Sequence, residues 1–167
     1  MPSLFFEDIL VGQSFETEAV SVSKADILSF ANSFDPNPFH LDREVARTQG
    51  FDDIIAPGMQ TLSLSMKLFF DLNLWNDAVL PSPGINSVRW LRPVLPDMKL
   101  YVKAEVIEVL PSKSKPNQGI IKILQDTMDR ETGAVLMTVE VLHRLKRRPA
   151  TNAPKREDAG PNREDAV

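Results

Sequence analysis

The amino-acid sequence predicts a single α+β domain, because one strand and several helices come first and a run of antiparallel strands follows. Three observations support this fold class. A capped amphipathic helix follows the first strand, a long apolar helix follows Gly58, and strand-forming segments occupy the second half of the chain. With 167 residues, 43% of them hydrophobic, the chain can bury one core and is too short for two ordinary domains.

The composition argues against several classes of partner and of chemistry. A formal net charge of -4 and a pI of about 5.2 disfavour nucleic acid or an anionic membrane as the main partner, since both select clustered Lys and Arg. The absence of cysteine excludes disulfides, thiolate catalysis and zinc-thiolate sites. The N-terminus lacks a secretory signal pattern, and no apolar stretch reaches membrane-spanning length. We therefore expect a soluble, cytoplasmic protein.

The chain divides into a folded part and a terminal tail. Residues 149–167 are rich in Ala, Asn, Pro and charge, and contain the unit Arg-Glu-Asp-Ala twice. Such a segment cannot build a core. We expect one domain at residues 1–148 and a mobile tail at residues 149–167.

The first elements are marked by turn and capping residues. Residues 14–22 carry β-branched side chains after Gly12, which indicates a strand. Ser23 and Asp26 then form a capping box for a helix that Pro36 terminates. Its apolar positions recur at helical spacing and are Ile27, Phe30, Ala31 and Phe34.

Later elements follow from periodicity and breaks. Asp42 is placed to cap a short helix at residues 43–48. From Gly58 to about Trp75 the sequence is apolar on nearly every side, so we expect a helix buried all round. A break at residues 81–84 precedes the strand candidates, which are residues 85–94, 100–109, 119–125 and 135–145, the last two joined by a turn at residues 129–133.

An acid and an imidazole lie close together after the first helix. Pro36 and Pro38 restrict the segment that carries Asp35 and His40, so we expect a stiff loop that presents an acid/base pair. On spacing alone, catalysis by His40 and a solvated loop histidine are equally acceptable interpretations. Asn37 could orient a water or a substrate oxygen, or it could form a local turn.

A metal site is an alternative use of the same segment. Asp35, His40 and Asp42 offer carboxylate and imidazole ligands that zinc or iron would accept. However, no other histidine lies nearby, and the helix cap explains Asp42 more simply. We therefore expect no metal.

Other residues of interest have plain structural interpretations. His143 shares the strand parity of apolar residues, so we expect a packed core histidine. Trp75 and Trp90 are expected in packing or at an interface. Gly58 begins the apolar helix, where its N–H would lie at the positive end of the helix dipole and where the lack of a Cβ would let a carbonyl approach. Alternatively, the glycine permits a turn after Pro57.

Two motifs resemble a known family. Residues 35–40 read Asp-Pro-Asn-Pro-Phe-His, and residues 55–59 read Ile-Ala-Pro-Gly-Met. They are similar to the loop and the helix start of the MaoC-like acyl dehydratases, the (R)-specific enoyl-CoA hydratases of the hot-dog fold. A weaker likeness lies in residues 89–94. The chain departs from the family's usual pattern at Phe34, Pro57 and Met66.

The resemblance implies a fold, a reaction and a site. The fold would be an antiparallel sheet wrapped around a long buried central helix. The reaction would hydrate a trans-2-enoyl-CoA to the (R)-3-hydroxyacyl-CoA, or run in reverse, with coenzyme A as part of the substrate and no separate cofactor. Asp35 and His40 would do the acid/base work and the Gly58 amide would bind the thioester oxygen, while Asn37, Met59 and Met66 would contact substrate.

Two other functions would suit the same fold. A hot-dog thioesterase would direct an activated water at the thioester carbonyl, and a non-catalytic acyl-CoA binding module would use the same pocket to sense ligand. The Asp35–His40 segment favours hydration, because the thioesterases that the chain resembles generally lack this motif.

We also expect a homodimer or a higher homo-oligomer, because a lone domain would expose a strand edge.

Overall fold

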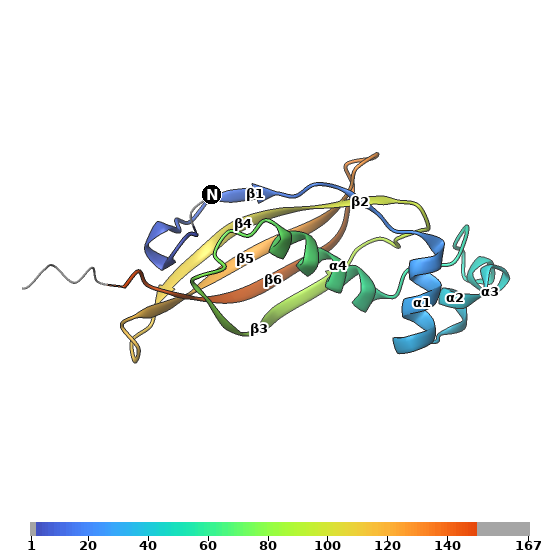
Figure 1. The fold of residues 1–167 in the computed structure, drawn as a ribbon. Helices are drawn as coiled ribbons and strands as arrows, with labels where there is room; N and C mark the ends of the chain where they lie inside the picture. Colours follow the sequence, from blue (N-terminus) through green and yellow to red (C-terminus); the bar gives the residue numbers. More distant parts are fainter. Residues whose placement is uncertain (1–2, 150–167) are drawn as a thin grey trace, which may run out of the picture.

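The computed structural model describes residues 3–149 and forms one layer of helix on one antiparallel sheet. The strand order is β1-β4-β5-β6-β3, and β2 also pairs with β4. Helices α1, α2 and α3 gather beyond one end of the sheet, and α4 lies along it (Figure 1). The elements are η1 (Phe6–Asp8), β1 (Ser14–Glu16), β2 (Val20–Ser21), α1 (Lys24–Phe34), α2 (Pro38–Leu41), α3 (Arg43–Thr48), α4 (Gly58–Asp71), β3 (Val79–Trp90), β4 (Lys99–Pro111), β5 (Gln118–Asp129) and β6 (Val135–Lys146).

This architecture confirms the predicted fold class. A long antiparallel sheet faces one central helix, as the resemblance implies. The expected tail at residues 149–167 lies, apart from Pro149, outside the described residues.

The predicted first strand is divided into two short strands. Thr17 stands between β1 and β2, and its hydroxyl accepts a hydrogen bond from the Val102 amide at 2.9 Å. The Thr17 amide in turn donates to the Val102 carbonyl at 3.0 Å. A side chain therefore replaces one rung of the backbone ladder, which is why the single strand predicted for residues 14–22 is wrong in detail.

The predicted start of α1 is confirmed. The Asp26 amide donates to the Ser23 hydroxyl at 3.1 Å, and the Ser23 amide donates to the Asp26 carboxylate at 3.3 Å. These two bonds satisfy amides that the first turn of a helix leaves free. The helix ends at Phe34, one residue before Asp35 and two before Pro36.

Helix α4 is shorter and more exposed than the sequence predicts. It ends at Asp71, and Leu72 forms its C-cap. Its buried face carries Thr61, Leu62, Ser65 and Phe69. Met59 and Phe70 are about half exposed, at 54% and 49%. The expectation of a helix buried all round is therefore wrong for this chain: one face meets the sheet and the other is open.

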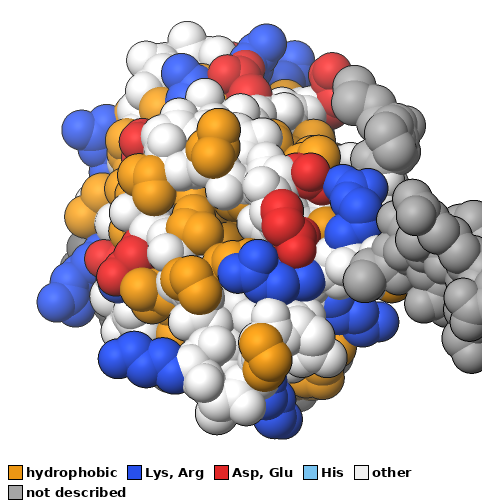
Figure 2. All heavy atoms as spheres, turned by 90° about the vertical axis from the view of Figure 1, so that its left-hand side faces the viewer, with side chains coloured by type: hydrophobic (Ala, Val, Ile, Leu, Met, Phe, Trp, Pro, Cys, Tyr) orange, Lys and Arg blue, Asp and Glu red, His pale blue; other side chains and the backbone are white. Residues whose placement is uncertain are grey.

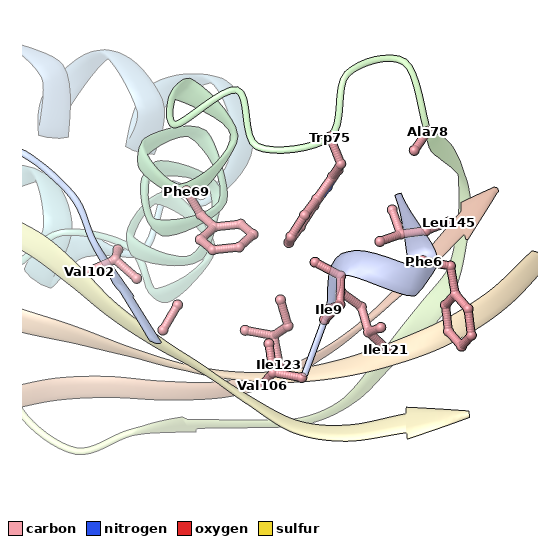
Figure 3. Packing of buried hydrophobic residues seen from close by; sticks show 11 residues of the cluster. Phe6, Ile9, Phe69, Trp75, Ala78, Val102, Val106, Ile121, Ile123 and Leu145 are labelled. Atoms are coloured by element: carbon pink, nitrogen blue, oxygen red, sulfur yellow. The ribbon is translucent and has the colours of Figure 1, made fainter. Parts of the chain in front are cut away.

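The core lies between α4 and the inward-facing side chains of the sheet. In Figure 3, Phe69 of α4 and Trp75 point toward Ile123 and Val106 of the sheet. Ring centroids of Phe69 and Trp75 are 5.5 Å apart. Residues Phe6 and Ile9 close this end of the core from the N-terminal segment. Burial of such side chains contributes about 1.5–3 kcal/mol each to folding.

Strand β3 begins earlier than the sequence predicts, at Val79 instead of residue 85. The break expected at residues 81–84 lies inside β3, where the register with β6 shifts between Leu80 and Gly84. Pro81 and Pro83 are tolerated because β3 is an edge strand and needs partners on one side only. The predicted turn between β5 and β6 is confirmed, with Asp129 accepting a hydrogen bond from the Thr132 hydroxyl.

Charges of both signs are mixed at the end of the molecule opposite α1. Figure 2 shows Lys and Arg beside Asp and Glu on this face, with hydrophobic side chains between them. Arg147 pairs with Glu7 at 3.5 Å, and Arg148 pairs with Asp8 at 2.6 Å. The basic run at the end of β6 is thus matched by carboxylates of the N-terminal segment on the same protein.

Candidate active site

A short helix presents the candidate histidine. Asn37 is the N-cap of α2 and Pro38 occupies its first turn, where a fixed φ and a missing N–H suit a helix start. The expectation of a plain loop is therefore wrong. Only 5% of His40 is exposed, because α2 packs its ring inward.

A long-range hydrogen bond orients the His40 ring. The Nδ1 atom lies 2.7 Å from the carbonyl oxygen of Ile55. A carbonyl only accepts, so Nδ1 must carry the proton. In neutral His40, the lone pair is then on Nε2, which lies 3.4 Å from Oδ2 of Asp35. The backbone after α3 therefore selects the tautomer that directs a basic nitrogen at the carboxylate.

Asp35 is held at the end of α1 by its neighbour. Its Oδ1 accepts a hydrogen bond from Nδ2 of Asn37 at 2.5 Å. The side chain of Asp35 is 31% exposed, whereas that of His40 is 6% exposed. The structure thus brings Asp35, Asn37 and His40 together, with the outer carboxylate facing solvent and the inner imidazole covered. Two acceptors on adjoining groups can bind the two hydrogens of one water.

Two free amides lie at the start of α4. Pro57 is the N-cap and offers no side-chain cap. Within residues 3–149, the amides of Gly58 and Met59 donate no hydrogen bond. Unpaired amides at a helix N-terminus carry partial positive charge and favour an oxyanion.

A cavity of about 270 Å³ borders the Gly58 end of α4. Ile55 joins this cavity to the acid/base pair, because it lines the cavity and its carbonyl anchors His40. The lining residues are Phe51, Ile55, Ala56, Gly58, Thr61, Trp90, Leu91, Arg92, Pro93 and Val94.

The remaining expected site residues lie elsewhere. Asp35, Asn37 and His40 do not line the cavity, and neither do Met59 and Met66. Met59 faces outward from α4. Met66 is half-buried and packs on a core cluster that contains Leu62, Met137, Val139 and Val141.

Sequence reasoning missed the role of Trp90. It was expected only in packing or at an interface, but its indole Nε1–H donates to the Gly58 carbonyl at 2.8 Å. The weak likeness of residues 89–94 to the family pattern was the one signal that pointed to this segment. Arg92 lines the same cavity.

The second histidine has the buried position expected of it. His143 is 2% exposed and lies among Phe69, Phe70 and Trp75, with ring centroids 5.5–6.0 Å away. Burial lowers the pKa of His143 to about 4, so the ring is neutral at pH 7.

The structure does not group the three side chains of the alternative metal site. Among the described residues, no group of three or more His, Asp or Glu side chains is arranged to hold a metal ion. Asp42 instead accepts hydrogen bonds from the amides of Glu44 and Val45, at 2.7 and 3.2 Å. This confirms that Asp42 caps α3.

Comparison with known proteins decides the family. The sequence profile described as the MaoC like domain matches residues 8–126, which include Asp35, His40 and Gly58. The chain belongs to the MaoC-like dehydratase family. It is 36% identical to the uncharacterized protein YdeM of Bacillus subtilis over 126 residues, which is 75% of this chain and 87% of YdeM.

Solved structures of family members agree with this assignment. A MaoC-like dehydratase from Rhodospirillum rubrum superposes with a TM-score of 0.79 and 32% identity, covering 89% of this chain and all of that one. The R-hydratase PhaJ1 from Pseudomonas aeruginosa superposes with a TM-score of 0.70 and 25% identity, covering 87% and 88%. The fold is therefore the single hot-dog domain of this family. No helix among residues 3–149 is long and apolar enough to cross a membrane.

Proposed function

We propose that this MaoC-like protein hydrates a trans-2-enoyl thioester, linked to coenzyme A, to the (R)-3-hydroxyacyl thioester, or catalyses the reverse dehydration. The family and the similarity to an R-hydratase support a hydratase or dehydratase in general. The specific reaction is proposed from the Asp35–His40 pair. In this pair the Ile55 carbonyl orients His40 so that the Nε2 lone pair faces the Asp35 carboxylate.

The pair would hold and activate the attacking water. Nε2 of His40 and Oδ2 of Asp35 are 3.4 Å apart, so one water can donate a hydrogen bond to each. The water oxygen then forms a bond to C3 of the substrate as one of its protons passes to the pair.

The start of α4 would stabilise the charge that develops. As the new C3–O bond forms, the electrons of the C2–C3 double bond move onto the thioester oxygen, where the Gly58 amide donates a hydrogen bond. A proton returned by the pair to C2 restores the thioester carbonyl. Water and substrate thereby combine without loss of any atom. Coenzyme A enters only as part of the substrate.

The reaction is tested on a short trans-2-enoyl-CoA. We expect loss of the enoyl absorbance without release of free thiol, and a product of (R) configuration at C3. The physical reason is that the water is directed at C3 and not at the thioester carbonyl. Thiol release that matches substrate consumption would contradict the proposal in favour of a thioesterase. Binding without reaction across a panel of enoyl-CoA chain lengths would favour an acyl-CoA binding module.

We also propose that the protein is a homodimer or a higher homo-oligomer. Strand β3 pairs with β6 on one side, and no described strand pairs with its other edge. Exposed apolar side chains lie on this strand and are Val79, Ile85 and Trp90, at 42%, 43% and 50% exposure. An unpaired edge with apolar side chains favours pairing with a second copy.

The assembly is tested by sedimentation at micromolar concentration. We expect a dimer or larger species for the unaltered protein, and a shift toward monomer for Ile85→Lys, because a charge on the edge opposes strand pairing. Leu10→Lys is the matched control, since Leu10 is 69% exposed and lies in the segment before β1, the strand at the opposite edge of the sheet from β3. A monomer before any substitution would refute the proposal.

A further inference from the structure

Trp90 makes two separate contacts with Gly58. The indole N–H donates to the Gly58 carbonyl at 2.8 Å. The ring also fills the space beside the Gly58 Cα, because a Cβ built there would lie 2.8 Å from Cε2 and 2.9 Å from Nε1. Real Cβ atoms essentially never approach other atoms so closely.

This geometry changes the reason for glycine at position 58. The sequence suggested that a missing Cβ lets a thioester carbonyl approach. In the structure, the side of Gly58 where a Cβ would project is covered by the Trp90 ring. Glycine is therefore required by the tryptophan, and the free amides must receive the thioester from another direction.

The hydrogen bond also acts on the amide that follows. The carbonyl of Gly58 and the N–H of Met59 belong to one planar peptide group. An indole that holds the carbonyl therefore holds the direction of the Met59 amide as well. Both the Gly58 and the Met59 amides are without partners within residues 3–149.

We propose that Trp90 is a positioning residue, which fixes the Gly58–Met59 peptide so that the Met59 amide points, beside the Gly58 amide, at the thioester oxygen. This inference rests on the proposed function and adds a residue to it. Trp90 itself is 50% exposed and lines the cavity beside Gly58, so its ring also forms one wall of the space for the thioester.

The first test separates the indole N–H from the indole ring. Trp90→Phe keeps an aromatic face but removes the donor, and we expect kcat to fall about two- to tenfold with little change in KM. Trp90→Ala removes both contacts and should lower kcat further. A rise in KM with kcat unchanged would mean that Trp90 only binds substrate, and would overturn the inference.

The second test couples the two residues in a double-mutant cycle. Gly58→Ala alone should lower kcat about a hundredfold, because its methyl group displaces the ring and misplaces the amides. In a Trp90→Ala background the same methyl meets no ring, so the further loss should be small. If Gly58→Ala costs as much without Trp90 as with it, the glycine serves direct thioester approach and the inference is wrong.

A matched control and a second readout keep this test independent of turnover. Trp75→Phe changes the other tryptophan, which is buried at the far end of α4, and should lower the thermal midpoint but not kcat. In that variant Trp90 is the sole tryptophan, and we expect butyryl-CoA, which cannot be hydrated, to change its emission. Unchanged emission at saturating butyryl-CoA would overturn the inference.

The contact between Gly58 and Trp90 can be tested even if the proposed hydration is not observed. If no enoyl thioester is hydrated, the coupling of Gly58 and Trp90 is still measured by the thermal midpoints of the four proteins of the cycle. If the midpoint change of the double variant differs from the sum of the two single-variant changes, the contact is supported. If the changes are additive, the inference is overturned.

Discussion

Asp35→Asn and His40→Asn should each lower kcat by about a hundred- to ten-thousandfold, the usual worth of a general acid or base. Asp35→Asn preserves shape but removes the charge that accepts a proton. His40→Asn is chosen because the asparagine amide can still donate to the Ile55 carbonyl while the titratable Nε2 is lost. Since His40 is buried, alanine at this position would leave a cavity and confuse stability with chemistry.

Steady-state kinetics on an enoyl-CoA, with a thermal midpoint for each variant, measure this effect. Asp26→Asn is the matched control: it makes the same change in a carboxylate that caps α1 away from the pair. It should cost some stability and leave kcat unchanged. Activity of both site variants within a factor of a few of the unaltered protein would show that the pair does not carry the reaction.

Acid should destabilise the protein through His143. Burial lowers the pKa of His143 from 6.5 to about 4 in the folded state. Below pH 6.5 the unfolded chain therefore binds a proton that the folded protein does not, and stability falls as the pH drops from 6.5 to 4. The full loss is about 3 kcal/mol, since one pKa unit corresponds to about 1.4 kcal/mol.

Urea unfolding at pH 7 and at pH 4 measures the loss. His143→Leu, which removes the titrating ring but keeps an apolar side chain, should flatten the pH dependence across this window. The pKa values of Asp8 and Asp53 are also lowered, chiefly by hydrogen bonds from the Phe5 amide and the Lys24 side chain respectively. The stability that these two carboxylates contribute is lost only as the pH falls below their usual pKa of 3.8. An equally steep pH dependence in His143→Leu would rule out His143 as the cause.

Local patterns predicted much of the first half of the chain. Ser23 and Asp26 are three residues apart, and their reciprocal bonds depend only on the local turn. The same holds for Asp42, which caps α3 through the next amides. Where a distant partner competes with local preference, prediction failed: Thr17 bonds to Val102, 85 residues away, and splits the first strand.

The same division applies to the candidate site. The fold class, the pairing of Asp35 with His40 five residues on, and the glycine at the start of α4 were predictable from the sequence. They depend on short spacings and on where Pro36 and Pro57 lie. Which His40 nitrogen carries the proton, and what covers Gly58, became visible only in the folded protein. Those contacts join residues 15 and 32 positions apart, Ile55 to His40 and Trp90 to Gly58, and chain folding alone brings such partners together.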